Sequence, residues 1–182
     1  VKDAAETHIQ QRSADIASAG HARAMRACRP GMAEYELEAE LTYEFRKRGA
    51  DAHAYTPIVA GGANACVLHY VSNDKILNDH TLVLIDAGCE VEGYAADITR
   101  TFPVNGRFNT AQKDVYQIVL AAQDAARVLG GCVEVVGEMV GEDAVDLLGH
   151  RAAVRAQPGL DVSHAHTQLL RGETGGQHRV RV

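Results

Sequence analysis

Hydrophobic residues in the N-terminal part of the chain recur every three or four positions, which is the spacing of a helix with one buried face. Two stretches follow this pattern, residues 3–28 and residues 32–48, and Arg29-Pro30-Gly31 interrupts them. We therefore predict two amphipathic helices, the second ended by Gly49 in a left-handed cap. The predicted core-facing residues of these helices are Ile9, Ile16, Met25, Cys28, Leu37, Leu41 and Phe45.

The pattern then changes to short apolar runs of the kind that form buried strands. Residues 55–60 and 66–71 are two such runs, and His69 lies inside the second. Residues 82–85 form a third run, and residues 94–102, rich in Thr, Ile and aromatic residues, form a fourth. Gly88 and Gly93 lie between the last two runs, so these runs are predicted to pair as an antiparallel hairpin.

A third helical pattern begins at Thr110, the predicted N-cap, and continues to about Leu129, just before Gly130-Gly131. The order of elements is then two helices, a mostly antiparallel set of strands and another helix. This order predicts an α+β fold in which helices pack on an antiparallel sheet.

Composition and charge narrow the class of protein. The 182 residues are enough for one domain with a hydrophobic core, and 46% of them are hydrophobic. A net charge of −6 and the lack of a long apolar run argue against nucleic-acid and membrane partners. The four cysteines are widely spaced, without a Cys-x-x-Cys pair, which indicates reduced thiols in a cytoplasmic protein.

Two aspartates in the predicted hairpin carry the clearest chemical signal. If the turn is centred between Val91 and Glu92, Asp86 and Asp97 face each other across the strands. Opposed carboxylates repel, so such a pair on an apolar hairpin needs a shared proton or a cation between them. Hard divalent cations bind carboxylate oxygens, and two such ions about 3.5–4 Å apart form a hydrolytic centre. We therefore interpret both aspartates as metal ligands rather than as solvated residues beside a turn.

The hairpin sequence IDAGCEVEGYAADITRTFPVNG resembles the metal-binding hairpin of the pita-bread metallopeptidases, most closely that of the aminopeptidase P (Xaa-Pro aminopeptidase) family. Two flanking segments, CRPGMAEYELEAEL and AYTPIVAGGANACVLHY, resemble the same family in the same order. The resemblance covers residues 1–129 and implies the N-terminal half of a pita-bread domain, whose sheet carries the metal site.

The resemblance implies a hydrolase that removes the N-terminal residue from peptides with proline in the second position. Two divalent ions, usually Mn²⁺, activate water in this family. By resemblance, Asp86 chelates one ion, Asp97 bridges both, and His69 stabilises the reaction intermediate. On residue type alone, His69 is an ordinary histidine of the core or the surface, so its catalytic role depends on the resemblance.

Residues 130–182 depart from the family pattern. From Val119 onward the chain has no Lys, Ile, Asn, Phe, Tyr or Trp. The further histidine and the two glutamates of the family's metal site are not recognisable there either. We therefore expect a truncated domain with a divergent tail that is disordered or read out of frame. Such a chain is expected to bind metal weakly and to have little or no peptidase activity.

Two alternatives to an enzyme stay open. Pita-bread relatives with incomplete metal sites serve as binding modules for peptides or protein partners, and the chain is compatible with such a role. The other alternative is an inactive truncated gene product, whose exposed apolar face drives homo-oligomerisation.

Overall fold

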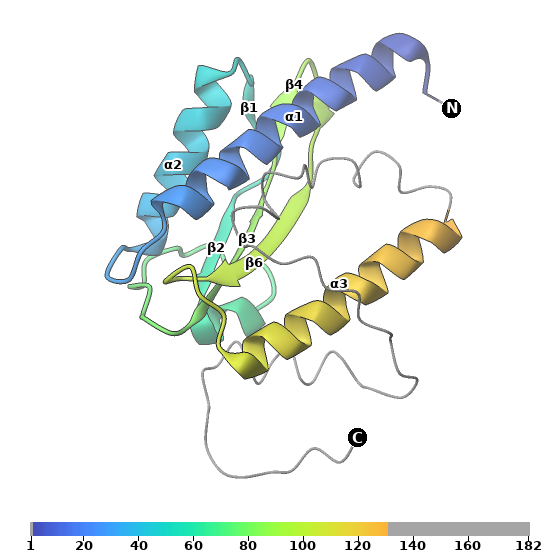
Figure 1. The fold of residues 1–182 in the computed structure, drawn as a ribbon. Coiled ribbons are helices and arrows are strands. Elements are labelled where there is room, and N and C mark those ends of the chain that lie inside the picture. The colour runs from blue at the N-terminus through green and yellow to red at the C-terminus, as the bar shows by residue number, and fades with distance from the viewer. Residues whose placement is uncertain (1, 131–182) are drawn as a thin grey trace.

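Three helices and two antiparallel sheets form the described part of the chain (Figure 1). The computed structural model describes residues 2–130, so the predicted tail lies outside the described residues from residue 131 onward. The helices are α1 (Ala4–Ala27), α2 (Glu34–Lys47) and α3 (Thr110–Gly130), with a short 3₁₀ helix, η1 (Gly62–Cys66). The strands are β1 (Ala52–His53), β2 (Ile58–Gly61), β3 (Leu82–Ala87), β4 (Cys89–Val91), β5 (Tyr94–Ala95) and β6 (Ile98–Pro103). The strand orders are β1-β4-β5 and β2-β3-β6.

The two predicted N-terminal helices are confirmed with nearly the expected bounds. Asp3 caps α1, because its side chain accepts a hydrogen bond from the Glu6 backbone N–H while the Glu6 carboxylate accepts one from the Asp3 N–H. The end of α2 is followed by Gly49, whose φ of 87° is the predicted left-handed cap. Local capping signals therefore set where both helices begin or end.

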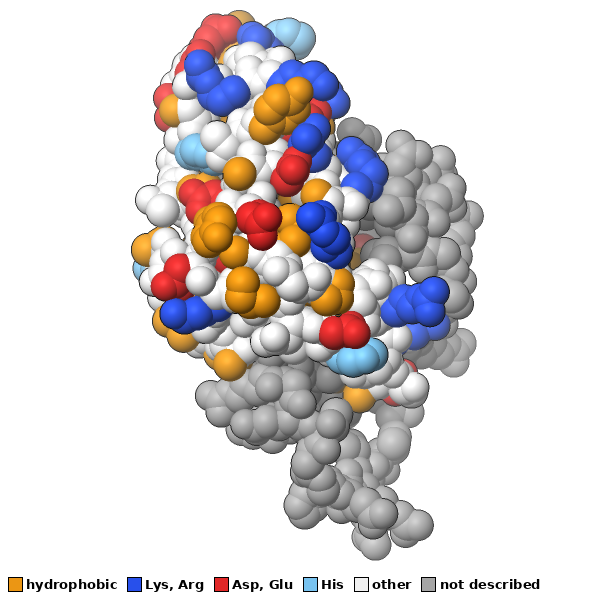
Figure 2. Space-filling view, turned by 90° about the vertical axis from the view of Figure 1, so that its left-hand side faces the viewer, with side chains coloured by type: hydrophobic (Ala, Val, Ile, Leu, Met, Phe, Trp, Pro, Cys, Tyr) orange, Lys and Arg blue, Asp and Glu red, His pale blue; other side chains and the backbone are white. Residues whose placement is uncertain are grey.

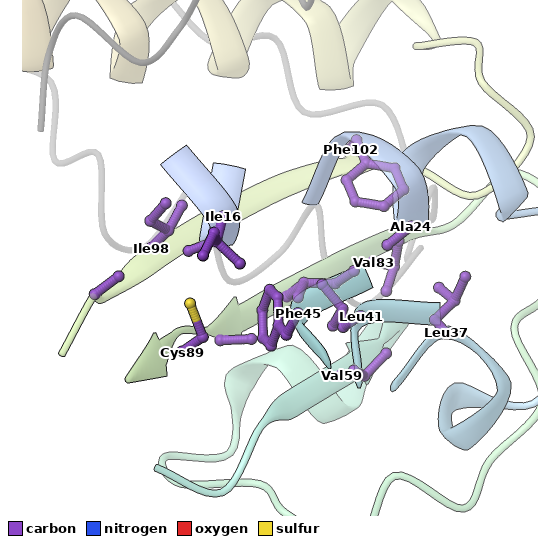
Figure 3. Close-up of a cluster of buried hydrophobic side chains, with 14 of the residues drawn as sticks. Ile16, Ala24, Leu37, Leu41, Phe45, Val59, Val83, Cys89, Ile98 and Phe102 are labelled. Carbon is purple, nitrogen blue, oxygen red and sulfur yellow. The ribbon is translucent and has the colours of Figure 1, made fainter. Parts of the chain in front are cut away.

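The hydrophobic core lies between α1, α2 and the inner face of the strands (Figure 3). The predicted stripe of α2 is fully buried there, with Leu37 and Leu41 at 0% exposure. Val83 and Ile85 of β3 face the same core, and Leu84 between them points to the other side of the sheet. The predicted α1 residues also contact this core: Ile9, Ile16, Met25 and Cys28. Since β3 pairs with both β2 and β6, its inner face organises the packing.

The predicted hairpin is present, but its register differs from the expectation. Glu92 and Gly93 form the two-residue turn, and their φ angles of 51° and 82° are those of a type I′ turn. Asp86 consequently pairs with Thr99, not with Asp97. The prediction that the two aspartates face each other directly is wrong, because the turn is centred one residue later than assumed. Asp97 is instead a diagonal neighbour of Asp86.

The strand predicted at residues 66–71 is also wrong. The chain forms η1 and then an irregular segment, and His69 has a φ of 52°, which no strand residue adopts. The physical reason is that Asn64 and Tyr70 both bond to the buried carboxylate of Glu34, which curls the chain instead of extending it. The strand predicted at residues 55–60 is confirmed as β2, although it begins later.

Helix α3 starts at the predicted residue, but Asn109 rather than Thr110 caps it. The Asn109 side chain accepts a hydrogen bond from the Gln112 backbone N–H at 2.9 Å, and the Gln112 side chain accepts one from the Asn109 N–H. The Phe108 ring packs on Tyr116 with 4.9 Å between ring centroids. These contacts fix the start of α3, which lies beyond β6 and away from α2 in Figure 1.

Acidic and basic side chains are interspersed on the face seen in Figure 2, with small apolar areas between them. One surface cluster joins Arg23 to Glu40 through an ion pair and places the Arg23 guanidinium 4.3 Å from the centroid of the Tyr43 ring. Ion pairs near the surface contribute little to stability, so packing in the core holds the helices in place. None of the helices within residues 2–130 has the length and apolar content needed to cross a membrane.

The contact between α1 and α2 generates a first prediction. A Cβ atom at Gly20 would lie 2.3 Å from Cε1 of the buried Phe45 ring. Although alanine is the better helix former, Gly20→Ala should therefore lower the free energy of unfolding by about 1–3 kcal/mol, measured by urea denaturation. The double variant Gly20→Ala/Phe45→Leu should recover part of the loss. An unchanged unfolding free energy in the single variant would contradict this close packing.

A second prediction concerns the buried His21, whose Nε2 lies 3.0 Å from the carbonyl oxygen of Ala87. Burial, reinforced by Arg100, lowers the pKa of His21 to about 4 despite this hydrogen bond. Because its pKa is lower in the folded state, His21 stabilises the fold above about pH 6.5, and this contribution is lost as the pH falls toward 4. The expected loss from His21 is about 2 kcal/mol between about pH 7.5 and pH 5, measured by urea unfolding at both values.

His21→Gln should remove most of this pH dependence, since the glutamine amide can donate to the same carbonyl without titrating. The matched control is His8→Gln, because His8 is exposed on the same helix. Equal pH slopes for wild type and His21→Gln would contradict the assignment.

Candidate functional site

Asp86 and Asp97 converge on the hydroxyl group of Tyr55. The Tyr55 Oη atom lies 2.6 Å from Asp86 Oδ1 and 2.9 Å from Asp97 Oδ1, and it donates its proton to these oxygens. Asp86 is on β3, Asp97 lies between β5 and β6, and Tyr55 lies between β1 and β2. The two carboxylates and the phenol therefore meet at one point from three separate segments of the chain.

A glycine permits this convergence. Gly88 lies opposite Asp97, between the β3–β6 and β4–β5 ladders. A Cβ atom at Gly88 would be 1.7 Å from the carbonyl oxygen of Ala96, so only glycine lets the two backbones approach this closely. Asp97 is thus held beside the end of β3, and its side chain can reach the same hydroxyl as Asp86.

The two carboxylates have no cationic partner within residues 2–130. No ion pair joins Asp86 or Asp97 to a Lys, Arg or His side chain of this region, and their Oδ2 atoms accept no hydrogen bond from it. Burial is the main cause that raises the pKa of Tyr55 above its ordinary value, and the two carboxylates raise it further. The phenol therefore keeps its proton. One proton shared between two carboxylates leaves excess negative charge at the site.

This arrangement fits a divalent cation as half of a site. Carboxylate oxygens are the donors that hard divalent cations prefer, and the two free Oδ2 atoms are available. The described residues contain no group of three or more His, Cys, Asp or Glu side chains that could surround an ion. Asp86 and Asp97 can therefore supply two ligands. A complete site would need further ligands besides these two aspartates.

His69 lies on a different segment from the aspartates, in the loop that follows η1. It is exposed, and it forms no hydrogen bond with Asp86 or Asp97. Its neighbours Leu68 and Val67 are 92% and 56% exposed, so this irregular segment presents an apolar surface beside the imidazole. The structure thus brings two of the three predicted site residues together.

The segment that carries His69 is anchored by Glu34, whose side chain is fully buried and has no cationic partner among residues 2–130. Its Oε1 accepts hydrogen bonds from the Gly61 N–H and the Asn64 side chain, at 2.8 and 2.9 Å. Its Oε2 accepts from the Tyr70 hydroxyl at 2.7 Å and the Lys75 N–H at 3.1 Å. Four donors therefore stabilise this carboxylate and fix both ends of the loop around His69.

Asn73 supports the opposite end of the same strand edge. Its side-chain oxygen accepts from the Val59 N–H, and its amide donates to the Pro57 carbonyl, both at 2.9 Å. Together with the Glu34–Gly61 bond, these contacts satisfy alternate backbone groups along the free edge of β2. Two buried polar side chains thus take the place of a neighbouring strand.

Sequence reasoning missed Tyr55 and Glu34. From the sequence, Tyr55 is only the first residue of the strand predicted at residues 55–60, and Glu34 is one residue of the helix predicted at residues 32–48. The sequence does not reveal their hydrogen-bond partners, because these lie far away in the chain. Tyr55 meets Asp86 and Asp97, and Glu34 meets Tyr70, only after the chain has folded.

Sequence comparison finds relatives over most of the chain. Residues 9–164 match metallopeptidase family M24, so the match continues past Leu129. The Xaa-Pro aminopeptidase of Escherichia coli (strain K12) is 48% identical over 143 residues, which are 76% of this chain and 32% of the relative. The Xaa-Pro aminopeptidase of Haemophilus influenzae is 50% identical over 126 residues, 69% of this chain and 29% of the relative. The chain thus spans about a third of the length of these curated relatives.

Structural comparison agrees with the sequence matches. Proline aminopeptidase P II from Yersinia pestis superposes with a TM-score of 0.67 and 56% identity, over 68% of this chain and 28% of that one. Zinc-substituted Escherichia coli aminopeptidase P in complex with product gives a TM-score of 0.70 and 43% identity, over 92% and 38%. These similarities confirm the expected α+β pita-bread fold, with helices packed on antiparallel strands.

The Glu34 network generates a third prediction. In Glu34→Gln, the amide nitrogen that replaces one oxygen would face two hydrogen-bond donors, so those bonds are lost. We expect the free energy of unfolding to fall by about 2–3 kcal/mol in urea denaturation, with faster protease cleavage within residues 62–75. The control Glu92→Gln removes a carboxylate that is exposed and 3.4 Å from Arg12, so it should change little. Equal effects of the two substitutions would contradict the structural role of Glu34.

Proposed function

Because this chain belongs to metallopeptidase family M24, we propose that it carries the first part of the metal centre of an Xaa-Pro aminopeptidase. The proposed reaction is hydrolysis of the bond between the N-terminal residue of a peptide and a proline in the second position. The observation that carries this proposal is the convergence of Asp86 and Asp97 on one hydroxyl group, without a cationic partner among residues 2–130.

In this proposal, Asp86 would hold one divalent ion and Asp97 would be shared between two. The free Oδ2 atoms of both residues and their shared negative charge support these roles. When bound, the ions activate water for attack on the scissile carbonyl carbon. Mn²⁺ is the proposed metal, since carboxylate-rich donor sets suit it.

His69 is proposed to donate a hydrogen bond to the carbonyl oxygen of the scissile bond as negative charge develops there. Its exposed imidazole forms no internal hydrogen bond that substrate binding would have to break in the described region. The loop on which it lies is anchored at Asn64, Tyr70 and Lys75 by Glu34, which supports a defined position rather than a freely moving one.

The 182-residue chain itself has too few recognisable ligands for two ions. Each divalent ion takes about six donors, and two aspartates cannot supply them for two ions. We therefore propose that the 182-residue chain binds Mn²⁺ weakly and hydrolyses Xaa-Pro peptides slowly or not at all. The predictions for residues 131–182 lie outside the described residues. The cytoplasmic location, the homo-oligomer and the exclusion of nucleic-acid and membrane partners stay predictions.

A fourth prediction tests the metal site by calorimetric titration of the purified chain with Mn²⁺. We expect a dissociation constant on the order of 1 mM, because only two carboxylates contribute. Asp97→Ala should abolish the binding, while the control Asp114→Ala, which removes an exposed carboxylate on α3, should leave it unchanged.

Three results would contradict the proposal. Binding that survives Asp97→Ala would place the metal elsewhere. Micromolar binding that Asp97→Ala abolishes would show that further ligands complete the site, and the predicted lack of turnover would then be tested with Xaa-Pro peptides. A chain that binds such peptides tightly without any metal would instead be a binding module.

A further inference from the structure

Tyr55 is the described residue that touches both proposed metal ligands. Its hydroxyl group donates to Oδ1 of Asp86 and Oδ1 of Asp97, at 2.6 and 2.9 Å. The Oδ2 atom of each carboxylate accepts no hydrogen bond from residues 2–130. The phenol therefore holds one oxygen of each carboxylate and leaves the other oxygen open.

The backbone on either side of Tyr55 is anchored by hydrogen bonds that do not involve the aspartate side chains. On one side, the Ala54 N–H donates to the Gly88 carbonyl at 3.0 Å. On the other side, the Pro57 carbonyl accepts from the side chain of Asn73 at 2.9 Å. Neither anchor uses the two carboxylates, so the backbone on both sides of Tyr55 is held whichever way Asp86 and Asp97 turn.

We propose that Tyr55 is a positioning residue for the metal centre, a role that rests on the proposed function of Asp86 and Asp97. Its hydroxyl orients both carboxylates so that their free oxygens face a common divalent cation. Loss of a hydrogen bond to the carboxylate oxygen that faces away from the ion commonly changes metal affinity 10–100-fold. Such a bond fixes the orientation of the ligand before the ion binds. Without the phenol, the two like charges would turn away from each other, and the cation would have to pull them together.

A purely structural hydrogen bond would produce a different result. Tyr94 provides the comparison, because its hydroxyl donates to the Glu6 carboxylate at 2.7 Å and joins α1 to β5. Both residues lose the same oxygen atom in a Tyr→Phe substitution, and both lose a bond to a carboxylate. Only Tyr55 bridges two carboxylates, so only Tyr55→Phe should affect the metal.

The experiment measures Mn²⁺ affinity and metal proximity in wild type, Tyr55→Phe and Tyr94→Phe. Free Mn²⁺ is counted by electron paramagnetic resonance, and we expect Tyr55→Phe to raise the dissociation constant about tenfold. Proximity is measured by Tb³⁺ emission excited through tyrosine, since the chain has six tyrosines and no tryptophan. Tyr55→Phe should remove most of the sensitised emission, and Tyr94→Phe should leave both measurements unchanged.

The outcomes separate this inference from the proposed function. If wild type and Tyr55→Phe bind Mn²⁺ equally, the positioning role is overturned while the metal site stands. If wild type binds no Mn²⁺, both fail. The inference is also overturned if the wild-type protein binds Tb³⁺ but shows no tyrosine-sensitised emission. This test needs no variant. Near-ultraviolet circular dichroism confirms that each variant is folded, so a loss of structure is not mistaken for a loss of affinity.

Discussion

The register of the hairpin is the constraint on which the rest of the site depends. The β3–β6 and β4–β5 ladders keep the same pairing across the gap at Gly88, so the turn at Glu92-Gly93 fixes both. In this register the inner face of β3 meets α1 and α2, while Asp86 points to the other face. A slip of one residue would bury the carboxylate and expose Ile85, which costs several kcal/mol, so hydrophobic packing enforces the position of the site.

The described structure contains carboxylates of two opposite kinds. Glu34 is fully buried, yet four donors satisfy it, and its effect is to hold the edge of β2 and the loop that carries His69. Asp86 and Asp97 share a single donor and have free oxygens. A satisfied carboxylate stabilises its surroundings, whereas a pair with unmet charge is available to a cation. This difference separates the structural residue from the proposed ligands more clearly than burial does.

Polar anchors rather than regular strands position the segments around the site. Asn73 holds Pro57 and Val59, and Glu34 holds Gly61, so the outer edge of β2 is paired by side chains. Tyr55 lies just before this edge, and His69 lies in the loop that returns along it. The edge therefore links the packing of α2, which carries Glu34, to the geometry of the proposed metal site.

The sequence by itself determined the three helices and the hairpin, because apolar periodicity, capping residues and a glycine turn act over a few neighbouring positions. It also singled out Asp86 and Asp97 as candidate ligands. It misplaced the turn by one residue and extended the chain around His69 into a strand. Only the tertiary structure decided that Asp86 and Asp97 meet diagonally at Tyr55, and that Glu34 curls the loop. Those contacts join residues about thirty to forty positions apart in the chain, and no local pattern encodes which distant donor will reach a carboxylate.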